Sequence, residues 1–357
     1  MQVQLYTDAN AFTILRAEWD ELLARSVVDT LFLRPAWAEA WWQVFGPEGG
    51  LRLLTVRADD GRLLGLAPLF LASVEADGAQ PAPALSFERP VPRPNTAPHA
   101  TLFLVGGTEV SDYLDFIVDR EQAGPVYRAL CEAIGAIEGW EWLDLHCLPE
   151  ESLTPALLGD RARAAGWSVT LVREDVCPTI ALPSTWDEYL HLLSKKDRHE
   201  LRRKMRRAEE AGQVQHFVVN DAATLDECLD RFMALHEAST PDKSDFMRDP
   251  RMRDFFRRVG HLAFDQGWLD LSFLAFDGAL AAAMFCFRYR DAVMVYNSGF
   301  DPQAWSSFSP GVVLLGRCIR QAIAEGRRKF DFMQGNERYK YDLGGQDRAV
   351  RRLFVRR

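Results

Sequence analysis

Two distant stretches of the chain decide its organisation: Phe32-Leu-Arg-Pro-Ala-Trp-Ala-Glu-Ala-Trp-Trp-Gln-Val-Phe-Gly46 and Phe246-Met-Arg-Asp-Pro-Arg-Met-Arg-Asp-Phe-Phe-Arg-Arg-Val-Gly260. They align without a gap at an offset of 214 residues. Each has a proline near its start, apolar residues at helical spacing and a closing glycine, which predicts a helix with one apolar face. The match indicates an internal duplication.

Two further matches follow in the same order. Residues 51–71 and 269–289 are apolar runs around an Asp-Gly turn, which predicts a β-hairpin. Residues 124–146 and 310–333 each predict a helix opened by Pro and Gly, followed by a strand that carries Asp144 or Asp331. The offset falls to 185–187, and a Pro-rich stretch at 80–98, expected to be a surface excursion, accounts for the difference. We therefore predict an α/β chain with two copies of one domain, at 1–175 and 176–357.

Charge is divided unevenly between the two halves. Residues 1–180 contain 26 Asp and Glu against 13 Arg and no Lys, whereas 181–357 contain 25 acidic and 29 basic residues. The halves thus carry −13 and +4, and every lysine lies at or after Lys195. We expect an anionic ligand to bind the second half.

Several classes of protein are excluded by missing motifs. The six cysteines form no CxxC element and the seven histidines no HExxH, so we expect no metal site. GxSxG, GxGxxG and GxxxxGK[ST] are absent, which argues against hydrolase, Rossmann and P-loop folds. We find no apolar run of membrane-spanning length and no signal peptide, and we expect a cytoplasmic protein.

The order of elements, together with several motifs, resembles the CelD/BcsL-like branch of the GNAT acyltransferase superfamily, which is related to the FemAB aminoacyl transferases. The resemblance covers nearly the whole chain and implies two GNAT-like domains in tandem, with mixed central sheets flanked by helices. It implies that the second domain carries the chemistry and that the first is structural or shapes the acceptor site. The motifs are Phe330-Asp-Phe-Met-Gln-Gly335 with Tyr339-Lys340, Ser309-Pro310-Gly311, Phe232–His236 with Phe246, basic residues 195–207, and Ser111-Asp112-Tyr113.

Acyl transfer from a thioester to an amine or hydroxyl requires a proton acceptor, a proton donor and a binding groove for the carrier. Asp331 follows the predicted crossover helix and is our candidate base, with Tyr339 as donor to the leaving group. Glu337 and Lys340 complete the catalytic candidates, Lys340 as a ligand for a carboxylate or phosphate. The alternative is that Asp331 caps a neighbouring backbone and Lys340 pairs with Glu337. A cell-envelope or polysaccharide precursor is our candidate acceptor.

The helix that begins at Pro310 offers free backbone N–H groups to the pyrophosphate of acyl-CoA, our expected co-substrate. The residues assigned to this site are Phe308, Ser309, Gly311 and Val312, with Tyr296 and Asn297 on the preceding strand. An ordinary cap by Ser309 is the alternative. The superfamily's [Q/R]xxGx[G/A] loop is reduced here to its last glycine, which leaves an acyl carrier protein or aminoacyl-tRNA open as donor.

Eight Lys and Arg between Lys195 and Arg207 surround most of a predicted helix. Without interleaved aromatic residues this run is more typical of a solvated surface than of a nucleic-acid site, so we expect no nucleic-acid partner. His236 is a candidate substrate contact, or else a half-buried structural imidazole. A FemAB-like aminoacyl-tRNA-dependent transferase and a catalytically silent scaffold remain the alternative functions. The sequence predicts no oligomeric state.

Overall fold

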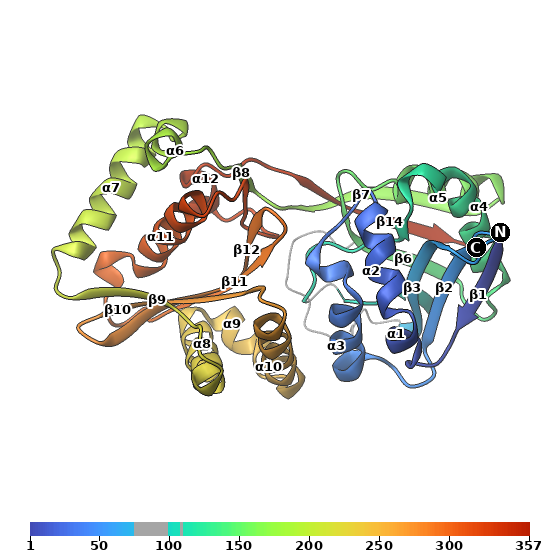
Figure 1. Cartoon of the computed structure of the whole chain (residues 1–357), viewed down its shortest axis with the longest axis horizontal. Helices are drawn as coiled ribbons and strands as arrows, with labels where there is room; N and C mark the ends of the chain where they lie inside the picture. Colours follow the sequence, from blue (N-terminus) through green and yellow to red (C-terminus); the bar gives the residue numbers. More distant parts are fainter. Residues whose placement is uncertain (75–98, 108–109) are drawn as a thin grey trace. The chain divides into compact units, whose positions relative to one another are not determined.

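The computed structural model describes residues 1–74, 99–107 and 110–357, so the predicted Pro-rich excursion at 80–98 lies outside the described residues. The chain forms two units. One comprises Met1–Asp175 together with Ala349–Arg357, and the other Val176–Arg348 (Figure 1).

The first unit is built on a sheet of order β1-β2-β3-β4-β6-β14-β7, with β5 paired to β3. Strands β4 and β6 are parallel and are joined through α4, whereas the other pairs for which a register is resolved are antiparallel. The elements are β1 (Gln2–Tyr6), α1 (Ala11–Ile14), α2 (Arg16–Arg25), α3 (Pro35–Phe45), β2 (Leu51–Arg57), β3 (Leu63–Val74), β4 (His99–Leu104), β5 (Ile117–Val118), α4 (Ala123–Ala136), β6 (Trp142–Pro149), α5 (Thr154–Ala164), β7 (Ser168–Val176) and β14 (Ala349–Arg356).

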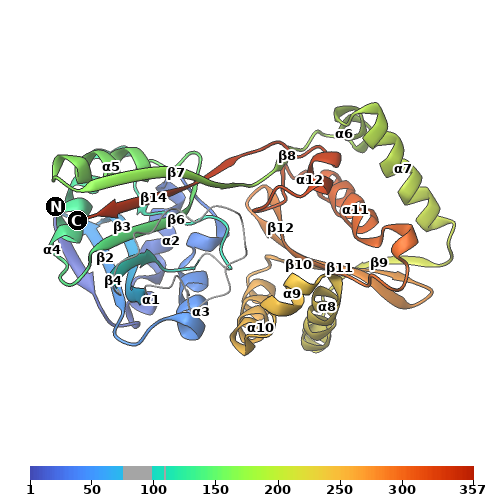
Figure 2. The same ribbon diagram turned by 180° about the vertical axis from the view of Figure 1, so that it is seen from behind.

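The second unit has a sheet of order β8-β13-β12-β11-β10-β9, in which only β12 and β13 are parallel among the described strands. Helices α8, α9 and α10 lie on one side of this sheet and α7 and α11 on the other (Figures 1 and 2). The elements are β8 (Thr179–Ala181), α6 (Trp186–Leu192), α7 (Lys195–Glu209), β9 (Val214–Val218), α8 (Leu225–Ser239), α9 (Pro241–Phe246), α10 (Pro250–Asp265), β10 (Leu269–Phe276), β11 (Ala279–Tyr289), β12 (Ala292–Phe300), α11 (Pro310–Ala324), β13 (Lys329–Asp331) and α12 (Arg338–Asp342).

The predicted duplication and fold class are confirmed. Helices α3 and α10 occupy the first matched stretch, and the hairpins β2–β3 and β10–β11 occupy the second. In the second hairpin Asp277 and Gly278 both have positive φ, as a tight two-residue turn requires. Each unit then has a parallel pair joined by a helix, β4–α4–β6 and β12–α11–β13.

The predicted boundary of the second domain is wrong for its last nine residues. Strand β14 pairs antiparallel with β6, and Arg352 donates to both oxygens of buried Asp144 at 2.7 and 2.6 Å. A buried carboxylate requires a cation, and the C-terminal strand supplies it. Residues 173–183, around the predicted domain boundary, contain the end of β7 and all of β8.

With β14 in the first unit, the net charges of the two units differ from those of the two halves of the sequence. Four of the last nine residues are arginines, so the first unit carries 26 acidic against 17 basic residues, a net −9. The second unit carries 25 of each sign and is neutral overall. Any attraction of anions to the second unit must therefore come from local positive charge.

A buried ionic network surrounds Asp144 in the first unit. His146 lies 3.1 Å from Asp144 through Nε2 and 2.6 Å from Glu174 through Nδ1. Burial alone would lower the pKa of His146, but the carboxylates of Asp144 and Glu174 raise it to about 9. Burial likewise opposes ionisation of Asp144, yet His146 and Arg352 hold its pKa below the usual range. The network is therefore charged on both sides at neutral pH.

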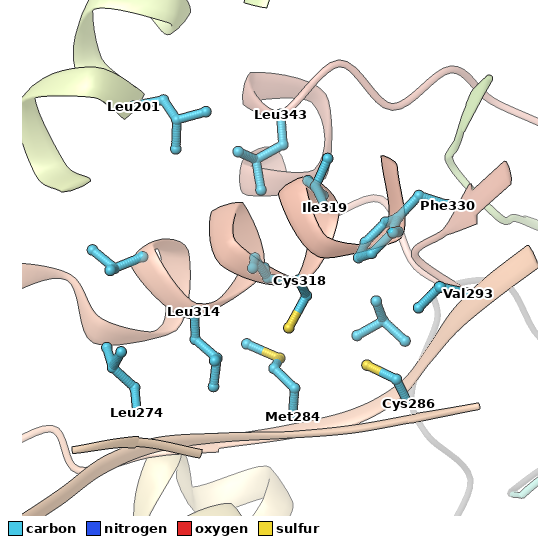
Figure 3. Packing of buried hydrophobic residues seen from close by; sticks show 14 of the residues in the cluster. Leu201, Leu274, Met284, Cys286, Val293, Leu314, Cys318, Ile319, Phe330 and Leu343 are labelled. Atoms are coloured by element: carbon cyan, nitrogen blue, oxygen red, sulfur yellow. The ribbon is translucent and has the colours of Figure 1, made fainter. Parts of the chain in front are cut away.

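The core of the second unit lies around α11 (Figure 3). Leu314, Cys318 and Ile319 of this helix are buried in one cluster with Met284 of β11, and Leu201 of α7 approaches the helix from the other side. Gly316 allows this approach, because a Cβ there would lie 3.2 Å from Leu201 Cδ1. Apolar packing thus fixes the helix whose N-terminus borders the candidate site.

Candidate active site

The candidate site lies where the parallel strands of the second unit separate. Strand β13 pairs with β12 only along Ala292–Met294, whereas β12 continues to Phe300. The carboxyl ends of the two strands and the N-terminus of α11 share one edge of the sheet, because α11 connects them. From Met294 to Phe300 the strand extends roughly 20 Å at about 3.3 Å per residue.

Helix α8 covers this extension of β12. A Cβ at Gly299 would lie 2.4 Å from the backbone nitrogen of His236, so helix and strand meet at a distance that only glycine allows. The Ser239 hydroxyl accepts from the Phe300 N–H at 2.8 Å. His236, 2% exposed, donates from Nδ1 to the Ser298 carbonyl at 2.9 Å.

His236 is a neutral imidazole in this position. Burial, with a smaller contribution from the ammonium of Lys243, lowers its pKa to about 3. At neutral pH the ring therefore carries no second proton, and its Nδ1–H orients the Ser298 carbonyl. Its contact with substrate stays a prediction.

Asp331, the expected base, is fully buried. Its Oδ1 accepts from the Met333 N–H at 2.9 Å and its Oδ2 pairs with Lys329 at 2.9 Å. Met333 has a positive φ of 60°, so the aspartate stabilises a strained turn. These contacts agree with the alternative that Asp331 caps a neighbouring backbone, and we leave it out of the proton path.

Lys340 is also held within the protein. The residue is 2% exposed, and its Nζ donates to the carbonyls of Met333, Gln334 and Gly335 at 3.1, 2.6 and 3.1 Å. It pairs with Glu337 at 2.8 Å. Since an ammonium has three hydrogens, the expected binding of a ligand carboxylate or phosphate by Lys340 conflicts with these contacts. Its role is to close the turn after β13.

Tyr339 remains suited to proton donation. Burial raises the pKa of its hydroxyl well above the usual range, with Glu337 adding to the shift, so the group stays protonated at neutral pH. The ring packs edge-on against Phe332 at 6.3 Å. Within the described residues the hydroxyl makes no hydrogen bond, which leaves it available to a ligand.

Tyr296 and Asn297 differ in their surroundings. The pairing of β11 with β12 shifts register at this point, and Tyr296 is the extra residue of the bulge. Its ring is 8% exposed and packs among Phe256, Phe285 and Phe287 with centroids 5.0–5.7 Å away. Tyr296 is therefore a core residue, whereas the partly exposed Asn297 stays a candidate.

The N-terminus of α11 begins with an unusual turn. Trp305 and Ser309 both have left-handed backbone conformations, and the Ser309 side chain makes no cap. In the described part of the chain the N–H groups of Gly311 and Val312 have no partner. The missing cap and the two free N–H groups make this helix N-terminus a candidate anion site.

Local positive charge reaches this terminus from α7. The Arg207 guanidinium lies 5.3 Å from the centroid of the Phe308 ring, which precedes the free N–H groups in sequence. Arg203 and Lys204 pair with Glu200 within α7, so part of the basic run is compensated internally. The apolar side of α7 packs on α11, through residues that include Leu201 and Ala208.

A sequence model of the acetyltransferase (GNAT) domain matches residues 195–341. This part of the second unit is therefore similar in sequence to acetyltransferase domains of the GNAT type. The match begins with α7 and ends just after Lys340, so it includes both the α11 terminus and the turn after β13. No curated protein sequence matches the chain.

Solved structures show that the tandem GNAT fold covers nearly the whole chain. FemX matches with a TM-score of 0.62 at 12% identity, over 99% of this chain and 97% of its own. A tandem GNAT protein from the clavulanic acid biosynthesis pathway matches at 0.51 and 12% identity, over 99% and 98%. L-PGS from Bacillus licheniformis matches at 0.53 and 12% identity, over 96% and 91%. At these identities the likeness concerns the fold.

Lys243 is the residue of the candidate site that the sequence analysis did not predict. It lies on α9, and its Nζ donates to the Ser298 carbonyl at 2.6 Å and to the Ser298 hydroxyl at 3.2 Å. The Thr240-Pro241 pair is a helix-start signal that could have placed Lys243 in a first turn soon after His236.

Two further structural findings concern membrane spans and metal clusters. In the part of the chain that the structure describes, every helix is too short or too polar to cross a membrane. Among the same residues, no three His, Cys, Asp or Glu side chains gather closely enough to hold a metal ion.

Proposed function

We propose that the chain is an N-acyltransferase, whose GNAT domain moves an acyl group from a thioester donor, acyl-CoA, to a primary amine or hydroxyl on an acceptor. We further propose that the chain is a CelD/BcsL-like transferase whose acceptor is a cell-envelope or polysaccharide precursor. One observation supports the proposal: the free N–H groups at the start of α11 and the side chains of Lys243 and Tyr339 belong to elements that meet at the β12–α11–β13 crossover.

The donor would extend along β12. Its phosphates would bind the free N–H groups of Gly311 and Val312, with Arg207 contributing positive charge. A linker of roughly 20 Å would bring the thioester to the region beyond Met294, where Tyr339 can protonate the leaving thiolate. Side chains of α8 and α9 already form hydrogen bonds with the backbone of Ser298 and Phe300 at this edge. The linker would therefore contact these side chains.

Ligand-induced stabilisation tests the donor. Acetyl-CoA or coenzyme A at 100 times its Kd should stabilise the folded protein by about 2.7 kcal/mol, seen as a higher Tm. Arg207→Met should weaken binding about two- to fivefold, the effect of losing one exposed cation near a phosphate. Arg231→Met, on exposed α8 surface, is the matched control. Absence of any shift with coenzyme A and several acyl-CoAs would refute this donor.

Aminoacyl-tRNA-dependent transfer is the second candidate, because α7 also presents Lys195, Lys196 and Arg202, which are exposed. Binding of charged tRNA through these groups would weaken steeply with salt. Titration at 50 and 200 mM salt distinguishes this from acyl-CoA binding at the α11 terminus. A protein that transfers no acyl group from either donor would be a scaffold.

A further inference from the structure

Lys243 is held in one position by its surroundings. The Thr240 hydroxyl accepts from the Lys243 backbone N–H at 3.4 Å, and Pro241 begins the helix. From this turn the side chain extends to Ser298, whose carbonyl also accepts from His236. Elements α8, α9 and β12 thus converge on one carbonyl at the edge where β13 has separated from β12.

Its charged form has no close counter-ion. In the described residues Lys243 forms no ion pair. The carboxylate whose charge acts on its pKa, that of Glu337, is bound to Lys340. Neighbouring His236 is neutral. Burial lowers the pKa of Lys243 to about 8. The negative charge of Glu337 opposes this shift, and the positive charge of Lys340 adds to it. Neutral and charged forms are therefore both populated near physiological pH.

The hydrogen-bond inventory is compatible with the neutral amine. A neutral lysine has two N–H groups and one lone pair, and the two Ser298 oxygens take both hydrogens. The lone pair is then left over. In the ammonium form a third N–H would have no partner among the described residues.

We propose that Lys243 is the proton acceptor for the attacking amine. This inference rests on the proposed function. As the amine nitrogen bonds to the acyl carbon, its proton passes to the neutral Nζ and the carbon–sulfur bond breaks. The thiolate then takes a proton from Tyr339, and the Lys243 ammonium returns its proton to the Tyr339 phenolate through solvent. The cycle leaves amide, thiol and both side chains in their starting forms.

Other candidates are unsuited to this step. Asp331 is occupied by Lys329 and the Met333 N–H, and burial lowers the pKa of His236 to about 3, which makes it a weak base. A base is most effective when its pKa lies near the working pH. Lys243 is the group in this cluster that meets both the geometric and the acid–base requirement.

Competitive acetylation tests the acid–base property without any enzymatic assay. The full-length protein is treated with trace labelled acetic anhydride between pH 6 and 11, and N-acetyl-lysine amide serves as internal standard. Mass spectrometry of the peptide that contains Lys243 should give a half-maximal reactivity near pH 8, about two units below the standard. A midpoint above pH 10 would overturn the proposal.

Kinetics test the role in the reaction. Lys243→Met and Lys243→Arg should each lower kcat by about 100-fold or more, since arginine keeps the charge but cannot accept a proton. The limb of the kcat–pH profile near pH 8 should disappear in both. Asp242→Asn, exposed on the same helix, is the control. An arginine variant within threefold of wild type would refute a base role.

The two proposals fail differently. If the wild-type protein transfers no acyl group from any thioester or aminoacyl-tRNA, the proposed function and the role of Lys243 fall together. If transfer occurs while the midpoint lies above pH 10 or kcat is unchanged in Lys243→Met, only the role of Lys243 falls.

Discussion

Gly299→Ala should separate the strand and helix that form the candidate site. The new Cβ would lie 2.4 Å from the His236 nitrogen and 2.5 Å from the Leu235 carbonyl carbon. Both are backbone atoms, so neither can rotate away, and the helix must move by about 1 Å to reach the ordinary contact distance of 3.4 Å. Overpacking costs about 1–3 kcal/mol. The His236–Ser298 hydrogen bond adds about 1 kcal/mol when it breaks.

We therefore expect the second unit to lose about 2–4 kcal/mol. With a urea m-value of about 2 kcal/mol/M, the unfolding midpoint should fall by about 1–2 M. Buried cysteines report on each unit, Cys286 on the second and Cys147 on the first. Alkylation in rising urea, followed by peptide mass spectrometry, gives the two midpoints separately.

Gly316→Ala is the control within the same unit. Its new Cβ would meet only the ends of Leu201 and Met205, at 3.2 and 3.3 Å, and these side chains can rotate. We expect it to shift the Cys286 midpoint by less than about 0.5 M, equivalent to about 1 kcal/mol. If Gly299→Ala shifts that midpoint no more than Gly316→Ala, the close contact of α8 with β12 is wrong.

Three further predictions concern stability. Arg352→Met should cost the first unit about 3 kcal/mol, seen in the Cys147 midpoint, because Asp144 stays buried with only His146 as cation. The first unit should be less stable at pH 9.5 than at pH 6 by about 3 kcal/mol: the protonated imidazole of His146 stabilises fully below about pH 6.5 and loses this effect as pH rises through its raised pKa of about 9. His146→Gln should abolish that difference in urea midpoints. Thr185→Ala should cost about 1 kcal/mol in the second unit, because the residue closes a capping box on α6.

Local signals in the sequence predicted most of the elements. The capping box at Thr185 with Glu188 is present with both of its hydrogen bonds, and the Asp-Gly hairpins form as expected. These features depend on residues within a few positions of each other, which is why spacing reveals them. The same holds for the Pro-Gly starts of α4 and α11.

Long-range choices could not be read in this way. Arg352 and Asp144 are 208 residues apart, and nothing in the spacing of β14 tells which sheet it joins. The roles of Asp331 and Lys340 depend on how the chain turns after β13, where Met333 and Gly335 have positive φ. Lys243 belongs to no motif, and only the contact of α9 with β12 makes it notable.

The way each copy ends explains why only the second carries a candidate site. Strand β4 pairs with β6 as far as Phe103 and ends at Leu104, whereas β12 continues six residues past its last pair at Met294. The equivalent aspartate of the first copy, Asp144, is bound by Arg352 of β14, which completes the first sheet. In the second copy the chain turns after β13, and this turn encloses the Lys340 ammonium. The candidate site thus lies in the copy whose parallel strands separate before the longer strand ends.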